Sequence, residues 1–278
     1  MSEGLNINNL SSKKLLEFTV PVPTLQQQRR IVAILDEAFA AINQCVAATE
    51  ARQSACTALF LSALERTFAR VAEENRRIPV AEIADHRLGK MLDRNKNRGR
   101  LRPYLRNQNV RWFEFDLEDV LEMRFEEAET ERYLVRKGDV VICEGGYPGR
   151  AAIWENEEPF FFQKALHRVR FADPLLAEWF LYYLFVEEQS GRLKRHFTGT
   201  GISHFTGKAL GRFEFPVPPE ATLSSKVPRF RHLRQAVAEA DAIAAEKLAA
   251  LTALKQSILH KAFTGELTSK TADKLVEV

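Results

Sequence analysis

What the chain lacks narrows the classes of protein to which it can belong. Its 278 residues include only three cysteines, Cys45, Cys56 and Cys143, with no Cys-x-x-Cys pair and no neighbouring histidine. We expect them to be buried thiols in a reducing compartment. No basic start precedes an apolar run, and no stretch approaches the length of a membrane span. These absences predict a soluble cytoplasmic protein without a metal site.

Signatures of known enzyme classes are also missing. The sequence contains no Gly-x-Ser-x-Gly, no His pair at metal-ligand spacing, and no Asn-Pro-Pro-Phe motif of the adenine-methyltransferase kind. The stretch from Gly201 to Lys208 resembles a phosphate-binding loop, but the spacing of its glycines is one residue too long. Glu144 is interpreted as a turn or ion-pair residue, with a nuclease carboxylate as the alternative. We therefore predict no catalytic residue in this chain.

Positive charge is concentrated locally. The 40 Lys and Arg against 37 Asp and Glu give a net charge of only +3, which does not indicate a polyanionic partner. The segment 87–111, however, carries nine basic residues against the single acid Asp93, interleaved with Asn and Gln. Basic side chains neutralise phosphates and amides pair with adenine, so this composition suits DNA; a solvated charged surface is the alternative.

Two further basic turns follow, at 144–150 and 192–201. Three such clusters in one domain favour a polyanionic ligand, and we predict that they read DNA. The candidate DNA-binding residues are Arg87, Lys90, Arg94, Lys96, Arg98, Arg100, Arg102, Tyr104, Arg106, Asn107, Asn109, Tyr147, Arg150, Lys194, Arg195, His196, Thr198 and Thr200.

A sequence repeat encloses this basic region. Residues 7–23 align without gaps on 202–218, with seven of the seventeen pairs identical, and both copies end in Pro-Val-Pro. Each copy then runs into a long segment of helical character. The repeat unit is therefore predicted to be a lead-in, a strand and a helix.

Two long helices are predicted, over 24–75 and 229–263. The first opens with a capping box of Thr24 and Gln27 and contains neither Gly nor Pro, while Gly265 closes the second. Apolar and small residues recur in both at alternating spacings of four and three, as in a coiled-coil seam. We expect an antiparallel pair; separate packing of each helix on the globular domain is the alternative. The predicted helix-interface residues are Ile31, Leu35, Ile42, Leu59, Leu233, Val237, Leu251, Leu254 and Ile258.

Between the helices the pattern is one of short strands and a single helix. Asp173 and Pro174 cap a helix whose aromatic face is expected to lie in the core. The predicted fold class is α+β, with one globular domain attached to two long helices that form an antiparallel coiled coil. The predicted strands are Ile78–Val80, Arg111–Phe115, Asp139–Ile142, Ala151–Trp154 and Leu166–Phe171.

Three stretches carry a family resemblance. They are 21–36 (PVPTLQQQRRIVAILD), 138–146 (GDVVICEGG) with Gln163-Lys164 and His167-Arg168 downstream, and 255–267 (KQSILHKAFTGEL). With them the chain resembles the specificity subunit of type I restriction-modification systems. The resemblance implies a non-catalytic DNA-recognition subunit that reads half of a bipartite site and docks methyltransferase subunits on its helices. S-adenosylmethionine would then be bound by those partner subunits, and a restriction subunit could join them.

The chain departs from that family plan because one of the two recognition domains is absent. We expect either a separate C-terminal half or a short subunit that forms a homodimer or pairs with a second half-length chain. The rival hypothesis is a coiled-coil adaptor that binds methyltransferase without reading DNA, and a nuclease is a third. The predicted parts are 1–23 (closing strand of a preceding recognition domain), 24–76 (helix), 77–218 (recognition domain), 219–268 (C-terminal helix) and 269–278 (tail).

Overall fold

The computed structural model describes residues 22–93, 95–199, 201 and 203–268. All of the first repeat copy except its last two residues, and the predicted DNA-binding residues Arg94 and Thr200, lie outside the described residues. The chain forms two compact units. Unit 1 is Met1–Ser54 with Ala240–Val278, and unit 2 is Ala55–Glu239.

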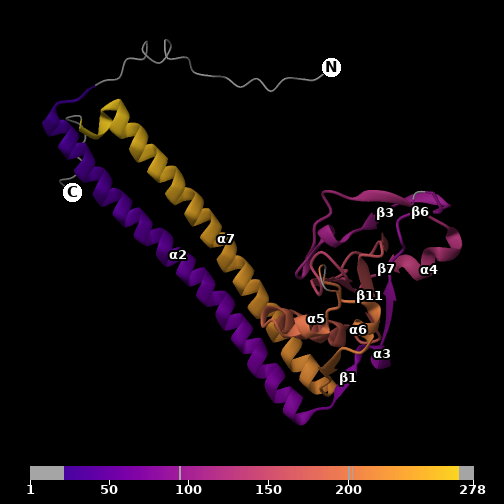
Figure 1. The fold of residues 1–278 in the computed structure, drawn as a ribbon. Coiled ribbons are helices and arrows are strands. Elements are labelled where there is room, and N and C mark those ends of the chain that lie inside the picture. Colours follow the sequence, from indigo (N-terminus) through magenta and orange to yellow (C-terminus); the bar gives the residue numbers. More distant parts are fainter. Residues whose placement is uncertain (1–21, 94, 200, 202, 269–278) are drawn as a thin grey trace, which may run out of the picture. The chain divides into compact units, whose positions relative to one another are not determined.

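Two long helices, α2 (Leu25–Glu74) and α7 (Glu220–Thr264), contribute segments to each unit (Figure 1). In unit 1 the Lys255 ammonium lies 5.1 Å from the centroid of the Phe39 ring. Further along, Thr49 and Ala244 line one cavity of about 390 Å³ between the helices. Because residue numbers rise on one helix as they fall on the other, the two segments are antiparallel, as predicted.

The start of α2 is the predicted capping box. The Thr24 amide donates to Oε1 of Gln27 at 3.0 Å, and the Gln27 amide donates to Oγ1 of Thr24 at 3.3 Å. The predicted start of the second helix at Arg229 is wrong, because α7 begins at Glu220 and includes Pro228. Proline removes one helical hydrogen bond. In compensation, Leu223 and Val227 on the same turns are buried in unit 2.

The residues of the predicted seam differ in burial along the two helices. Ile42 is buried, but Leu59 and Leu254 are 68% and 48% exposed, and Cys45 is exposed as well. The buried neighbour of Leu59 is Phe60, at 5% exposure. A strict 3.5-residue repeat drifts by about 20° per heptad against a helix of about 3.6 residues per turn, so it leaves the buried stripe. The other predicted interface residues are half-buried: Ile31, Leu35, Leu233, Val237, Leu251 and Ile258.

By length and composition α2 could also cross a membrane, since an 18-residue window in it has a mean hydropathy of 1.5. The expectation that no stretch approaches a membrane span is therefore wrong for this helix. One such helix is weak evidence for a membrane, because helices of soluble proteins pass the same test.

Unit 2 contains two four-stranded sheets, with strand orders β2-β11-β8-β9 and β6-β3-β10-β7, and two short strand pairs, β1-β12 and β4-β5. The strands are β1 (Arg77–Pro79), β2 (Ala84–Leu88), β3 (Arg100–Leu105), β4 (Val110–Arg111), β5 (Glu114–Phe115), β6 (Leu121–Phe125), β7 (Leu134–Val135), β8 (Val140–Cys143), β9 (Ala151–Ile153), β10 (Phe160–Phe162), β11 (Leu166–Phe171) and β12 (Glu214–Pro216). The helices are α3 (Val80–Ile83), α4 (Thr130–Tyr133), α5 (Pro174–Gln189) and α6 (Gly207–Gly211), with short 3₁₀ turns η1 (Asn107–Asn109), η2 (Glu127–Glu129) and η3 (Arg192–His196); η4 (Glu266–Thr268) lies in unit 1.

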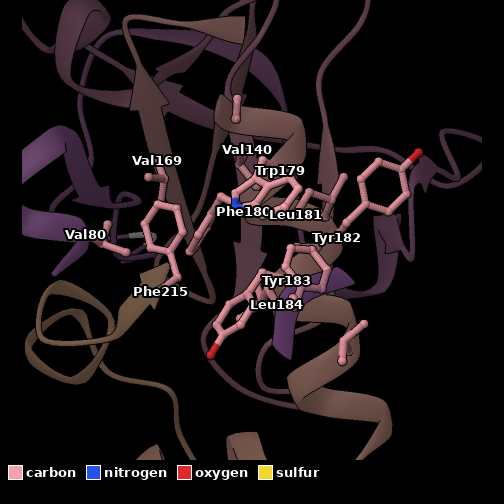
Figure 2. Close-up of a cluster of buried hydrophobic side chains, with 14 of the residues drawn as sticks. Val80, Val140, Val169, Trp179, Phe180, Leu181, Tyr182, Tyr183, Leu184 and Phe215 are labelled. Carbon is pink, nitrogen blue, oxygen red and sulfur yellow. The ribbon is translucent and has the colours of Figure 1, made fainter. Parts of the chain in front are cut away.

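Side-chain packing arranges these elements in layers. The main core joins one face of the β2-β11-β8-β9 sheet to α5 and to the unit-2 segments of α2 and α7, with Trp179 and Phe180 fully buried (Figure 2). A second cluster, including Leu105, Val141 and Phe162, lies between the two sheets. The order is therefore helices, first sheet, second sheet. The Asp173 side chain accepts from the Leu175 amide at 2.8 Å, which confirms the predicted cap of α5.

Most of the predicted strands are present, but several strands of the structure were not predicted. Leu166–Phe171 is found as predicted, and Arg111–Phe115 is replaced by the hairpin β4-β5. Strands β2, β3, β6, β7 and β10 were not predicted. Four of the six residues of β3 are exposed, so it lacks the apolar alternation by which half-buried strands are recognised.

Candidate nucleic-acid interface

Three loops of unit 2 meet at one end of the β2-β11-β8-β9 sheet. They are the turn 106–111, the turn 144–150 between β8 and β9, and the loop 198–204, and we call their meeting point the three-loop junction. The Asn107 side-chain amide donates to the Gly145 carbonyl at 3.2 Å, and the Phe205 amide donates to the Glu144 carbonyl at 2.7 Å. Segments predicted separately from sequence are therefore brought together by these contacts.

The turn 144–150 needs glycine at two places. Gly146 has φ +77°, and a β-carbon on it would lie 2.3 Å from Nδ2 of Asn107. Gly149 has φ +90°, and its β-carbon would lie 2.3 Å from Cδ2 of Leu193, in η3. Both the left-handed backbone and the close approach exclude larger residues. The glycines thus let the turn pack against η1 on one side and η3 on the other.

Tyr147 is the exposed aromatic residue at the tip of this turn, with 59% of its surface accessible. The Arg150 guanidinium carbon lies 3.9 Å from the centroid of its ring, and Nη2 of Arg150 donates to the Asn107 carbonyl at 2.9 Å. Sequence reasoning predicted that both side chains point outward. The structure exposes Tyr147 and uses Arg150 as its support.

The loop 198–204 is attached to the same turn by a polar contact. Nδ1 of His204 lies 3.2 Å from Oε2 of Glu144, and since an ionised carboxylate only accepts, Nδ1 is the donor. The Thr198 and His204 backbones exchange hydrogen bonds of 2.9 and 2.8 Å, which close the loop. Glu144 is therefore a turn residue, one of the two roles predicted from sequence, and it accepts a hydrogen bond from His204.

Several predicted DNA-binding arginines are neutralised by the protein's own acids. Arg106 pairs with Asp119 at 2.8 Å and is only 14% exposed, and Arg111 pairs with Asp116 at 3.1 Å. Asn109 is buried, where its side chain accepts from the Arg106 amide at 2.9 Å and donates to backbone carbonyls. These residues shape the turn, so the prediction of Arg106 and Asn109 as direct DNA contacts is corrected to a supporting role.

Two more predictions fail because the side chains are buried. Lys90 is 6% exposed and forms an ion pair with Glu129, and it also donates to the Arg124 carbonyl at 3.0 Å. Burial opposes ionisation of Glu129, yet the Glu126 amide and the Lys90 ammonium hold its pKa below the ordinary value. Tyr104 is 2% exposed in a cluster with Met123 and Phe125. Neither Lys90 nor Tyr104 presents its side chain to a ligand.

Other basic residues of 87–111 lie away from the junction. Arg100 and Arg102 are exposed on β3 of the second sheet, where they line a depression of about 210 Å³ together with Glu126 and Glu127. The basic segment therefore does not form one continuous face. Arg87 pairs with Asp85 at 3.1 Å, Lys96 lies 3.9 Å from Asp93, and Arg98 donates to the Asn95 carbonyl at 2.7 Å.

The basic cluster in and after η3 also contains both accessible and less accessible side chains. Arg195 lies 3.4 Å from the buried carboxylate of Glu187 but its side chain is 59% exposed, whereas His196 is half-buried with its ring 5.0 Å from that of Phe213. Lys194 and Thr198 are exposed. Of the predicted residues 194–198, Lys194, Arg195 and Thr198 therefore present accessible side chains beside the junction.

Sequence reasoning did not select three residues of the junction or its border. Gln108 is exposed within η1, and His204 contacts Glu144. Lys164 is exposed next to Ala165, whose carbonyl accepts from the Glu144 amide at 2.8 Å. A single polar residue in a loop has no sequence pattern that marks it as functional. Of the three, only Lys164 could have been selected, because it lies beside a basic motif.

A second charged feature of unit 2 lies between α2 and α7. Arg66, Arg70, Lys226 and Arg229 line a groove of about 260 Å³, together with Ala63, Thr67, Phe230 and Leu233. None of the lining residues is acidic, and none of these four cations forms an ion pair within the described part of the chain. We call this surface the basic groove. Across the described residues, no three His, Cys, Asp or Glu side chains gather in a way that could hold a metal ion.

The fold and the junction define a class: an α+β module, carried between two long helices, that presents a compact set of polar loops. The family model described as the type I restriction modification DNA specificity domain matches residues 80–237, more than half of the chain. The chain therefore belongs to this family of type I restriction-modification DNA specificity domains.

Individual relatives agree with the family assignment. The chain is 23% identical over 291 residues to the EcoKI specificity subunit of Escherichia coli, covering 97% of this chain and 62% of that protein. A chain from a structure of the type I restriction-modification system shares the fold with a TM-score of 0.69 and 23% identity, over 88% of this chain and 60% of that one. The HsdS subunit from Thermoanaerobacter tengcongensis gives a TM-score of 0.56 and 23% identity, over 96% and 65%. The chain thus spans less than two thirds of these relatives.

Proposed function

We propose that this chain is the non-catalytic DNA-reading subunit of a type I restriction-modification methyltransferase, and that it reads one half of a bipartite site. The observation that carries the proposal is the three-loop junction, which lies within the residues matched by the family model. The chain spans 62% of the length of its curated relative. Under this proposal, pairing with another copy or with a second half-length chain would read the other half of the site.

The junction offers chemistry suited to base recognition. Asn107 and Gln108 each use one amide hydrogen within the protein, on the Gly145 carbonyl and on Asp119, and the other hydrogen and the oxygen of each amide can pair with adenine. The ring of Tyr147 can pack against a base or a thymine methyl group. Lys164 and Lys194 can neutralise backbone phosphates. The residues of the junction would thus set the sequence preference, and the basic residues on its border would contribute most of the affinity.

Methyltransferase subunits are proposed to dock on the helices, with the basic groove as the contact. The groove combines four cations with the half-buried apolar side chains of Ala63 and Leu233, so it suits an amphipathic helix that carries acidic residues. Cofactor chemistry, including the binding of S-adenosylmethionine, belongs to those partner subunits under this proposal. A cytoplasmic location follows from the function.

The first experiment measures DNA affinity against salt for the chain in complex with the methyltransferase subunit of its own system. If about six basic residues meet phosphates, the log-log slope is expected near −5. Lys164→Gln and Lys194→Gln should each reduce the slope by about one without changing sequence preference. Binding that is insensitive to salt contradicts the DNA-reading role.

The rival function is an adaptor that binds methyltransferase without reading DNA. Genome-wide mapping of methylated adenines separates the two hypotheses, since a reader directs methylation to one sequence and an adaptor does not. For the groove, Arg66→Glu with Arg70→Glu should abolish co-purification with the methyltransferase. The control is Lys208→Glu with Arg212→Glu, an exposed basic pair at the same spacing. If the groove pair weakens DNA binding and leaves co-purification intact, the groove contacts DNA instead.

A further inference from the structure

We propose that Glu144 and His204 form a clasp that positions the loop 198–204 for sequence selection. This inference rests on the proposed DNA-reading function and adds to it a pair of positioning residues that need not touch DNA themselves. The proposal is based on the 3.2 Å contact between Nδ1 of His204 and Oε2 of Glu144, two residues that lie 60 positions apart in sequence and belong to different loops.

Glu144 holds the base of the loop at two points. Its carbonyl accepts from the Phe205 amide at 2.7 Å, and its carboxylate accepts from the adjacent side chain of His204. The carboxylate is mostly shielded, with the Glu144 side chain 16% exposed and that of His204 41% exposed. A shielded, charge-assisted hydrogen bond is stronger than one in bulk water, so this contact can fix an orientation.

Among the described residues of the loop, the hydrogen bonds lie at its base, on Thr198 and His204. Gly199 and Gly201 have no side chains, and Ser203 is exposed. On the opposite side, a β-carbon on Gly145 would lie 3.0 Å from Nδ1 of His204, so the glycine makes room for the imidazole. The direction of the loop is therefore set at its base, by the hydrogen-bonded pair Thr198/His204 and by the clasp.

Loss of the clasp should affect sequence-specific and non-specific DNA binding differently. Contacts to base edges depend on accurate placement, whereas phosphate contacts tolerate movement because charge acts over several ångströms. Releasing the loop should thus weaken binding to the recognised sequence and leave non-specific binding unchanged. If the clasp only stabilised the fold, its loss would reduce specific and non-specific binding alike, in proportion to the unfolded fraction.

The test compares wild type with His204→Ala, Glu144→Gln and the exchanged pair Glu144→His with His204→Glu, each in complex with its methyltransferase subunit. The probes are a duplex containing the methylated-site sequence and a scrambled duplex. We expect each single variant to bind the specific duplex about tenfold more weakly, as for loss of a charge-assisted hydrogen bond. Affinity for the scrambled duplex and its salt slope should stay within about twofold, as phosphate contacts persist.

Recovery of selectivity in the exchanged pair supports the clasp, because it restores the contact with reversed roles. His232→Ala, which alters an exposed histidine on α7, is the control and should change neither affinity. Equal losses on both duplexes, accompanied by a lower melting temperature, overturn the positioning role. Unchanged selectivity in the single variants overturns it as well. If wild type itself does not distinguish the duplexes, the proposed function fails first, and the clasp with it.

Discussion

The guanidinium of Arg150 stacks 3.9 Å from the ring centroid of Tyr147 and is anchored to the carbonyl of Asn107 at 2.9 Å. Arg150 therefore has a structural role, although it lies in a basic turn. Its Nε atom is buried without a hydrogen-bond partner among the described residues, which shows how far the side chain is withdrawn from solvent. Positive charge near a candidate DNA surface is therefore not by itself a phosphate contact.

The first prediction concerns this support. Arg150→Ala should release the Tyr147 ring and remove one hydrogen bond to the Asn107 carbonyl, and a hydrogen bond from a charged group contributes about 1.5–3 kcal/mol. We expect about a tenfold or larger loss of affinity for the recognised duplex with an unchanged salt slope. The measurement is a fluorescence-anisotropy titration at several salt concentrations.

A phosphate contact would give a different result for Arg150. In that case the slope would fall by about one and affinity would drop equally for all sequences. Arg136→Ala is a suitable control, because Arg136 pairs with Glu131 on an exposed surface.

A second prediction tests the buried stripe of α2. Phe60 is 5% exposed and packs against Tyr182 and Phe185, so Phe60→Ala should destabilise unit 2 by about 3–5 kcal/mol. Its neighbour Leu59 is 68% exposed, and Leu59→Ala should change stability by less than about 0.5 kcal/mol. Urea denaturation measures both. The reverse ranking would restore the seam predicted from the heptad pattern.

Stability should depend on pH through His167. Burial lowers its pKa from 6.5 to about 4, and its Nε2 lies 2.9 Å from the Phe205 carbonyl. Between these two values the unfolded state binds more protons, so stability falls as pH falls from 6.5 toward 4 and is constant above. Between pH 7.5 and 5 the loss from this residue is about 2 kcal/mol.

The measurement is the free energy of unfolding at the two pH values in wild type and His167→Gln, whose amide can still donate to the Phe205 carbonyl. The variant should lose less stability on acidification. His86, whose pKa is also lowered by burial, contributes in the same direction and remains in both proteins. An identical pH dependence in wild type and variant would refute the prediction.

Thiol labelling should distinguish the cysteines. Burial raises the pKa of Cys143 to about 11, and its thiol lies 3.5 Å from the Asn107 carbonyl beneath the three-loop junction. Cys45 is exposed. At pH 8 we expect iodoacetamide to modify Cys45 rapidly and Cys143 only on opening of the junction, as seen by peptide mass spectrometry. Comparable rates at both sites would show that the junction is open in solution.

Helix-capping residues in the sequence correctly predicted where two helices begin. The Thr24/Gln27 box fixed the start of α2, and Asp173 with Pro174 fixed that of α5, because capping is a contact within one turn. The strand Leu166–Phe171 was predicted as a short segment bounded by turns. Strand β3 was not, because it pairs with β6 and β10 through its backbone while most of its side chains remain exposed.

The amino-acid sequence by itself determined the helix–domain–helix order, the α+β class and the family, since periodicity, capping and motif spacing are properties of neighbouring residues. Only the tertiary structure decided which basic residues are free to meet DNA. It buried Lys90 against Glu129, paired Arg106 with Asp119, and placed Arg150 beneath Tyr147. The partners of a charge come from distant parts of the chain, and whether a guanidinium is neutralised, buried or exposed depends on those partners.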